Sequence, residues 1–220
     1  IYEDIKKVAA EEVLMVDPGR LNFALYKNIP ENVKKVEERN PAILFKCVKN
    51  PTEVENIRIA EIKDSVAHVR FMKWLKENVG KETITEMSAS DKLDEFRAEM
   101  GGFIRPSFGP ISAFGEHSAI VHYSSSPETN VELHEGTFLM TDTGAGFYEG
   151  STDITRTYAF GEVSQIMKDH FTLVAISNLN LASPIFKKGC CGMNFDYLAR
   201  KPFWDRGLDF NHGTGHGVGY

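Results

Sequence analysis

Two aspartates that flank a glycine-rich turn are the residues of this sequence best suited to chemistry. Asp142 and Asp153 lie within residues 141–157, where glycines separate two apolar runs. This pattern is typical of a β-hairpin. Folding back brings the two carboxylates roughly opposite each other, with Cβ atoms about 4.5–5.5 Å apart. Because paired metal ions in hydrolases lie about 3.5–4 Å apart, the two aspartates have the reach to share two divalent cations.

Two other interpretations of this stretch compete with a metal site. Aspartate beside glycine is common in ordinary turns, so the pair alone leaves a structural role open. A phosphate-binding loop is disfavoured, because Gly144, Gly146 and Gly150 do not form the G-x-G-x-x-G spacing. The β-branched residues that follow also stand where a helix should begin.

A second element, residues 211–220, alternates side chains strictly with glycine. Four glycines disfavour a helix, and in an extended chain His212 and His216 point to one face while the glycines leave the other face bare. At a rise of about 3.3 Å per residue, the two histidines lie on the order of 13 Å apart and cannot bind one ion together. One can be a metal ligand while the other lines a substrate groove.

The two elements resemble the metallopeptidase family of aminopeptidase P, prolidase and methionine aminopeptidase, which shares the pita-bread fold. The resemblance is closer to the multidomain aminopeptidase P enzymes and runs from about Lys49 to the end of the sequence. It is carried by three segments that appear in the expected order, namely 119–123 with 127–130, 142–146 with 152–157, and 204–219.

This resemblance implies that Asp142, Asp153 and His216 are metal ligands for two divalent cations, with manganese as the expected metal. In the family, two glutamate ligands and one further histidine lie downstream of the histidine-glycine strand, and the present sequence stops at Tyr220. Two carboxylates and one imidazole cannot fill two near-octahedral sites. The sequence is therefore expected to be a fragment that lacks the C-terminal part and is inactive alone.

The resemblance also implies roles for residues that touch the substrate. His122 corresponds to a catalytic histidine that contacts the substrate and helps to shuttle protons, and His212 to a histidine that lines the pocket on the proline side. Thr155 and Arg156 lie where the family supports the strand that carries a ligand.

The function implied is a metal-dependent aminopeptidase that cleaves between an N-terminal residue and a following proline, so its partners are peptides with proline at the second position. A prolidase or creatinase-like hydrolase on the same fold stays open as an alternative. So does a non-catalytic binding module, although such a module has no reason to keep Asp142, Asp153 and His216 together.

Composition limits the other partners and the compartment. The sequence has 25 Lys and Arg against 31 Asp and Glu, and this net charge of −6 argues against nucleic acid. No apolar run approaches the roughly 20 residues of a membrane span. Cys47, Cys190 and Cys191 are an odd number of cysteines without metal-binding spacing, which favours a reducing, cytoplasmic setting over a disulfide framework. Apolar surface left uncovered in a fragment would favour a homodimer.

The predicted fold is α+β, with helices on one face of a curved, mainly antiparallel sheet that is incomplete at the C-terminus. Residues 1–45 are expected to end a preceding non-catalytic domain, and residues 46–220 to form the catalytic domain. A capping box at Thr52 is expected to open a long helix, and Pro202 to end the last helix early. The expected helices are 3–13, 52–78, 85–100, 164–182 and 195–204, and the expected strands are 13–16, 42–45, 103–108, 118–123, 137–148 and 153–160.

Overall fold

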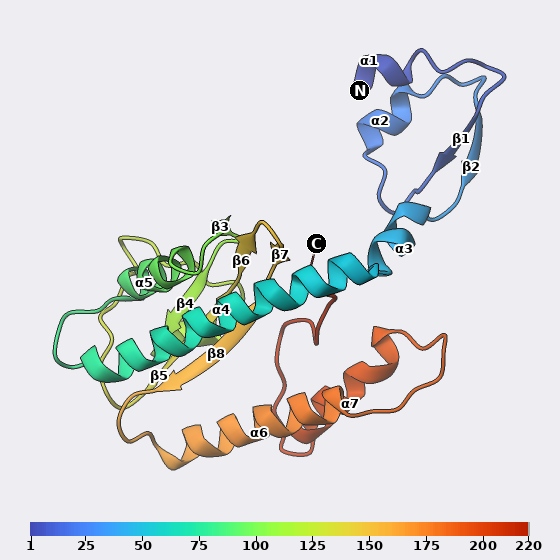
Figure 1. Ribbon diagram of the computed structural model, residues 1–220. Coiled ribbons are helices and arrows are strands. Elements are labelled where there is room, and N and C mark those ends of the chain that lie inside the picture. Colours follow the sequence, from blue (N-terminus) through green and yellow to red (C-terminus); the bar gives the residue numbers. More distant parts are fainter. Residues whose placement is uncertain (220) are drawn as a thin grey trace. The chain divides into compact units, whose positions relative to one another are not determined.

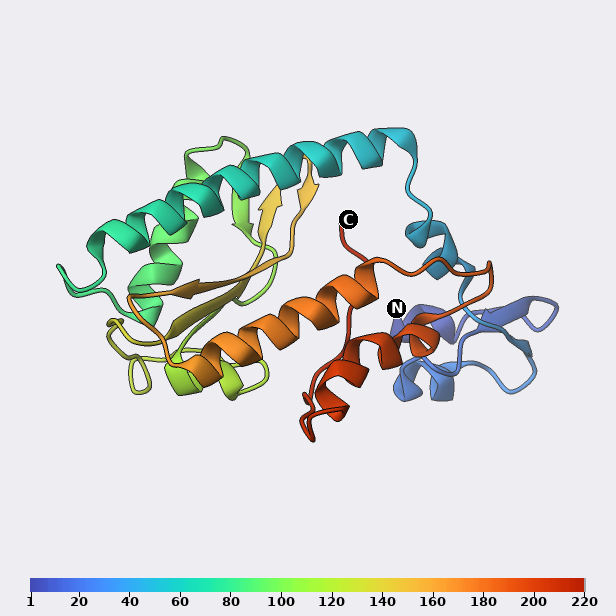
Figure 2. The same cartoon turned by 90° about the horizontal axis from the view of Figure 1, so that it is seen from below.

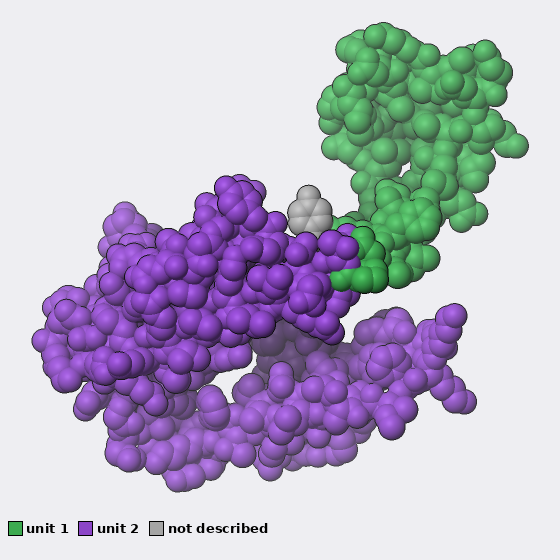
Figure 3. All heavy atoms as spheres, in the orientation of Figure 1, with its two compact units in different colours: residues 1–51 green, residues 52–220 purple. Residues whose placement is uncertain are grey.

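The chain forms two compact units in a computed structural model that describes residues 1–219 (Figures 1 and 3). The first unit spans Ile1–Pro51 and the second Thr52–Tyr220. It stays a prediction that the first unit is the end of a preceding non-catalytic domain. Among residues 1–219, none of the helices combines the length and the apolar composition that a membrane span requires.

The first unit is built around two short parallel strands, β1 (Val13–Val16) and β2 (Lys34–Glu37). The unit also contains three short helices, α1 (Tyr2–Ile5), α2 (Phe23–Asn28) and α3 (Pro41–Cys47). The helix predicted over 3–13 is therefore wrong beyond its first turn. The strand predicted over 42–45 is also wrong, because Pro41 occupies the first turn of α3 and the Asn40 side chain caps it by accepting a hydrogen bond from the Ala42 amide.

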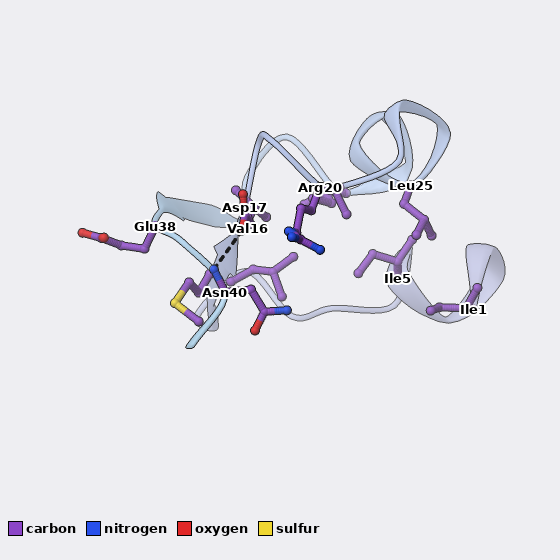
Figure 4. A pocket seen from close by; sticks show the side chains of 12 residues that line it. Ile1, Ile5, Val16, Asp17, Arg20, Leu25, Glu38 and Asn40 are labelled. Carbon is purple, nitrogen blue, oxygen red and sulfur yellow. Dashed lines mark hydrogen bonds between the residues drawn. The ribbon is translucent and has the colours of Figure 1, made fainter. Parts of the chain in front are cut away.

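Figure 4 shows a largely apolar cavity of about 340 Å³ in this unit. Its polar rim includes Asp17, whose Oδ2 accepts a hydrogen bond from the Asn40 amide at 2.9 Å. No histidine lines the cavity. It therefore does not offer the set of side chains that the sequence motifs predict for a metal site.

Two helices, α4 (Pro51–Asn78) and α5 (Glu86–Ala98), cover one face of the sheets in the second unit (Figures 1 and 2). α5 begins as predicted, with the Thr85 hydroxyl accepting from the Ser88 amide. α4 begins one residue before Thr52, at a proline, so the predicted capping box is wrong. The main core joins both helices to the strands through Phe71, Leu75, Leu93, Phe114, Leu139 and Tyr158.

The strands form two antiparallel three-stranded sheets. One has the order β4 (Ile111–Phe114), β5 (Phe138–Thr143) and β8 (Ile154–Ala159), and the other the order β3 (Phe103–Pro106), β6 (Ala145–Phe147) and β7 (Gly150–Ser151). The single strand predicted over 137–148 is thus broken at Gly144, where the chain passes from one sheet to the other. A Cβ at Gly144 would lie only 2.1 Å from the Thr152 carbonyl oxygen, so only glycine fits at this crossing.

The strand predicted over 118–123 is wrong, because the chain forms a 3₁₀ helix over Gly115–Ala119 followed by a turn. Its Ala-Ile-Val run has strand propensity, but contacts of His117 and Tyr123 with the buried Glu86 side chain favour the compact form. β4 was not predicted, although it is a short apolar run bounded by turn residues.

The last helices, α6 (Gln165–Ala182) and α7 (Gly192–Trp204), lie side by side in both ribbon views (Figures 1 and 2). α7 continues two residues past Pro202, so the prediction that Pro202 ends the helix is wrong. Residues 211–219 form no strand, since no other segment among residues 1–219 pairs with them. Tyr220, the last residue of that predicted strand, lies outside the described residues.

Candidate active site

One cavity of about 570 Å³ in the second unit gathers most of the side chains that the sequence motifs predict for a site. Its lining contains His122, Asp142, Asp153 and His216, whereas His212 does not reach it. The remaining lining residues are Phe108, Gly109, Ile111, Tyr123, Ser124 and Thr155. The structure therefore brings together predicted site residues that are up to 94 positions apart in the sequence, from His122 to His216.

The two aspartates reach the cavity from neighbouring strands, but they are not directly opposite each other. Asp142 on β5 pairs with Thr155 on β8, and Asp153 precedes β8, two residues before Thr155. Residues two apart in an extended chain point to the same face, so both carboxylates face the cavity in a diagonal arrangement. The simple hairpin expected from the sequence is wrong because β6 and β7, which pair in the other sheet, intervene between the two aspartates.

Each aspartate has its own electrostatic environment. The Thr155 hydroxyl donates a hydrogen bond to Asp142 Oδ1 at 2.9 Å, and the supporting role expected for Thr155 stays a prediction. Burial, followed by the negative charge of Asp142, raises the pKa of the Asp153 carboxyl, and His216 opposes this shift. A carboxylate whose proton affinity is raised by burial and by a neighbouring negative charge is also favoured by a nearby cation.

His216 contacts one of these carboxylates directly. Its Nε2 lies 3.2 Å from Asp153 Oδ2, and its Nδ1 lies 2.8 Å from the Gly217 carbonyl oxygen. A proton on Nδ1 satisfies that carbonyl and leaves Nε2 to face the carboxylate, an orientation common among metal-bound histidines. Two ligands at right angles, each about 2.1 Å from one ion, are about 3 Å apart. The pair therefore has the spacing of two neighbouring ligands of one cation.

The segment that carries His216 is held by side chains of α7 rather than by a strand ladder. Arg200 donates to Asp196, to Asp209 and to the backbone oxygens of Phe210 and His212. The Thr214 hydroxyl donates to Asp196 Oδ1 at 2.8 Å. α7 thereby fixes the glycine-rich segment on the side from which His216 enters the cavity.

His212 is turned to a different environment. Its ring lies against Phe210, with centroids 4.6 Å apart, and its Nδ1 lies 2.8 Å from the Gly213 carbonyl oxygen. The structure does not place His212 with the other four predicted site residues. Its role on the proline side of the substrate stays a prediction.

His122 enters the cavity from a strained turn. Its φ of 57° is the only positive value of a non-glycine residue among residues 1–219. The next residue, Tyr123, is buried and donates a hydrogen bond from its hydroxyl to Glu86 Oε2 at 2.8 Å. Glu86 Oε1 also accepts from the Phe114 amide at 2.7 Å and contacts His117 Nδ1 at 2.8 Å.

Glu86 and Tyr123 support the site but were not predicted from the sequence. Glu86 is fully buried in the first turn of α5 and holds both ends of the segment that presents His122. Because Glu86 follows the helix cap at Thr85, the sequence could have predicted an acidic residue in the first turn of a helix. It could not have predicted the contacts of Glu86 with residues far away in the sequence.

The donor chemistry of this cavity fits part of a divalent metal centre. Carboxylate oxygens with one imidazole suit divalent cations such as manganese or zinc. Among residues 1–219, however, no group of three or more His, Cys, Asp or Glu side chains is placed to hold a metal ion by itself. Asp142, Asp153 and His216 can thus contribute to a metal site, but they do not form a complete one.

The chain is similar to several known proteins. Xaa-Pro aminopeptidase 2 of Sus scrofa is 36% identical over 198 residues, which is 90% of this chain and 29% of that protein. An X-prolyl aminopeptidase from Caenorhabditis elegans, a cytosolic enzyme with a di-nuclear active site, is 33% identical with a TM-score of 0.87, over 94% of this chain and 34% of its own. An Xaa-Pro dipeptidase from Bacillus anthracis is 26% identical with a TM-score of 0.79, over 99% and 60%.

The present chain thus spans about a third of the aminopeptidases it matches and about 60% of the dipeptidase. The structural similarity confirms the α+β, pita-bread fold. The profile of metallopeptidase family M24 matches residues 55–220. The chain therefore belongs to metallopeptidase family M24.

Proposed function

We propose that the protein is a metal-dependent aminopeptidase that removes an N-terminal residue preceding proline. The observation that carries this proposal is the single cavity that contains Asp142, Asp153, His122 and His216, with His216 Nε2 3.2 Å from Asp153 Oδ2. The names of the aminopeptidase relatives support the same activity and a substrate class of peptides with proline at the second position.

Asp142, Asp153 and His216 would hold two divalent cations, together with ligands beyond these three. The oxygen-rich donor set supports manganese, and the solved relative from C. elegans is described as di-nuclear. When bound, such a pair of cations makes a nucleophile available at neutral pH and polarises the scissile carbonyl.

The residues of the chain itself supply binding and proton transfer. An imidazole exchanges a proton near neutral pH, which suits His122 for contacting the substrate and moving a proton at the leaving amine. Thr155 holds Asp142 through its 2.9 Å hydrogen bond and so keeps that carboxylate turned into the cavity. In this proposal His212 lies on the proline side of the substrate.

The second candidate is a prolidase, which acts on dipeptides. The similarity to an Xaa-Pro dipeptidase favours it over a creatinase-like hydrolase and over a non-catalytic binding module. Turnover of an Xaa-Pro dipeptide compared with an Xaa-Pro-Xaa tripeptide separates the aminopeptidase from the prolidase. A creatinase-like hydrolase would cleave neither peptide, and a binding module would bind no pair of cations.

The cysteines and the N-terminal residues bear on the location and the domain organisation of the enzyme. The three cysteines of the chain are exposed and unpaired, which supports a cytoplasmic location. Residues 1–45 would belong to a preceding non-catalytic domain, and the enzyme would be a homodimer that needs neither nucleic acid nor a membrane.

The test uses the full-length protein, freed of metal and titrated with manganese in a calorimeter, and then assayed on an Xaa-Pro-Xaa peptide. We expect two equivalents to bind and turnover to appear with them. Asp142→Asn and His216→Ala should weaken binding and abolish turnover, because each removes a ligand. Asp169→Asn, which changes a carboxylate on the outside of α6, is the matched control and should change neither. Full manganese binding and turnover in Asp142→Asn would contradict the proposal.

A further inference from the structure

A buried ion pair lies directly behind the candidate metal ligands. Asp64 on α4 is 0% exposed and Arg97 on α5 is 1% exposed. Arg97 donates from Nε to Asp64 Oδ1 at 2.8 Å and from Nη2 to Asp64 Oδ2 at 3.2 Å. This two-pronged contact fixes the planar guanidinium group relative to the carboxylate and therefore the two helices relative to each other.

The ion pair extends to the strands through two threonine hydroxyls. Arg97 Nη2 donates to Thr143 Oγ1 at 2.9 Å, and Thr152 Oγ1 donates to Asp64 Oδ2 at 2.5 Å. Both threonines are buried, at 1% and 2% exposure. Thr152 Oγ1 also accepts a hydrogen bond from the Ala145 amide at 2.8 Å, which joins the two strand segments to each other.

The positions of these threonines next to the ligands are the decisive feature. Thr143 follows Asp142, and Thr152 precedes Asp153. Adjacent side chains of an extended chain point to opposite faces. The two threonines therefore anchor the buried face at the same points where the two aspartates reach into the cavity.

The backbone between these anchors has little room to move. The Ser107 amide donates to the Gly144 carbonyl oxygen at 3.0 Å, and the Ser107 hydroxyl donates to the Thr152 carbonyl oxygen at 2.9 Å. The close approach of Gly144 to Thr152 admits no side chain. A shift of either threonine thus moves the neighbouring aspartate with it.

A buried ion pair contributes little net stability compared with well-packed apolar residues of the same size. Its directional hydrogen bonds instead specify one geometry, because each partner is costly to leave unsatisfied. We therefore attribute to these four side chains the task of holding Asp142 and Asp153 in place, and not mainly that of stabilising the fold.

We propose that Asp64 and Arg97 are positioning residues that, through the hydroxyls of Thr143 and Thr152, set the separation of the Asp142 and Asp153 carboxylates and so the affinity for the divalent cations. This inference rests on the proposed metal site. Groups that orient metal ligands in this way typically change metal affinity by about 10- to 100-fold when they are removed, so an effect of about 10-fold is expected for one hydroxyl.

The experiment measures manganese affinity and stability side by side in the metal-free, full-length protein. Thr143→Val and Thr152→Val each remove one hydroxyl with little change of shape, and both should weaken manganese binding by about 10-fold. Thr143→Ser and Thr152→Ser retain the hydroxyl and should restore the affinity. If a valine variant does not fold, the matching serine variant is compared with Thr→Ala at the same position.

Thr141→Val is the matched control. Thr141 is equally buried and lies on the other side of Asp142, and its hydroxyl donates to the Arg156 carbonyl oxygen at 3.4 Å instead of bonding to Asp64 or Arg97. We expect its thermal midpoint to fall as in the other valine variants while manganese affinity stays at the wild-type value. This result would separate positioning from general stability.

The outcomes distinguish a failure of the positioning role from a failure of the metal site. Valine variants that lose thermal stability but bind manganese as the wild type does would overturn the positioning role and leave the metal site intact. Equal loss of affinity in Thr141→Val would also overturn it. Unchanged manganese binding in Asp142→Asn would instead contradict the metal site itself.

Discussion

His122 combines a proposed chemical role with a backbone conformation that its residue type disfavours. A φ of 57° brings the Cβ of a non-glycine residue close to the backbone and costs about 1–2 kcal/mol. Tyr123 holds this turn through its hydrogen bond to Glu86 and through its backbone amide, which donates to the Ile120 carbonyl oxygen at 3.1 Å. Strain of this kind persists where the surrounding contacts determine the conformation.

This conformation predicts that substitutions at position 122 change activity and stability independently of each other. In the full-length enzyme, His122→Ala and His122→Gly should both lower turnover of an Xaa-Pro peptide by about 10²–10⁴-fold, because both remove the group that transfers the proton. Manganese content should stay the same. His122→Gly should be more stable than His122→Ala by about 1 kcal/mol, since glycine adopts a positive φ without strain.

Peptide turnover and urea denaturation measure the two effects. Wild-type turnover in His122→Ala would show that His122 has no part in the reaction. Equal stability of the alanine and glycine variants would show that the turn relaxes when the imidazole is removed.

At the scale of elements, His68 connects α4 to β8 in the core behind the cavity. The side chain is 5% exposed, and its Nδ1 lies 3.1 Å from the Tyr158 hydroxyl. Burial lowers the pKa of His68 to about 4, with the positive charges of Arg97 and Arg156 acting in the same direction and the negative charge of Asp64 opposing them. The native state therefore holds this histidine neutral at physiological pH.

A lowered pKa at His68 predicts that stability falls as the pH falls from about 6.5 towards 4. In the unfolded chain His68 titrates near 6.5, so below that pH the unfolded state takes up a proton that the native state does not. The contribution of His68 should drop by about 2 kcal/mol between pH 7 and pH 5. Urea denaturation at both pH values should show this drop in the wild type and a smaller one in His68→Gln. His170→Gln, at an exposed position of α6, is the control; parallel behaviour of the wild type and His68→Gln would contradict the prediction.

Much of the helical framework follows from local signals in the sequence. Thr85 and Ser164, at which two helices were expected to begin, cap α5 and α6 by accepting hydrogen bonds from amides three residues on. The apolar spacing of α4 likewise predicts a long helix. These signals depend only on residues a few positions apart, so contacts with distant parts of the chain do not override them.

The segments that present the histidines could not be predicted, because their conformations depend on distant partners. Residues 118–123 have strand propensity, but the buried Glu86 carboxylate holds them in a turn. Residues 211–219 alternate as a strand would, yet Arg200 and Asp196 hold this segment without a ladder. Asp142 and Asp153 were correctly expected to face one cavity, while their diagonal offset depends on the crossing at Gly144.

At the scale of the whole molecule, the outer surface of α6 and α7 is unusually apolar. Large apolar side chains are exposed along both helices and their connection, among them Ile166 at 62%, Leu179 at 66%, Ile185 at 102%, Phe186 at 61% and Met193 at 86%. Surfaces of this kind mark contacts with other protein segments or with a second copy.

This surface predicts that the 220-residue chain associates with itself through α6 and α7. Sedimentation velocity over a range of concentrations should show a shift from monomer to larger species, and Leu179→Asp should reduce it. Ile104→Asp, which places the same charge on the exposed side of β3, is the control and should leave association unchanged. A chain that stays monomeric at every concentration would contradict the prediction.

The buried network also has a consequence for how the protein folds. Thr152 and Asp64 are 88 residues apart in sequence, and Thr143 and Arg97 are 46 apart. Contacts that close such long loops form slowly, because the chain loses much conformational entropy before they stabilise it. During synthesis, Asp142 emerges before Thr152, and its geometry is not defined until both helices have docked. The geometry proposed for cation binding is therefore expected to form late in folding, once the completed core fixes the positions of the two aspartates.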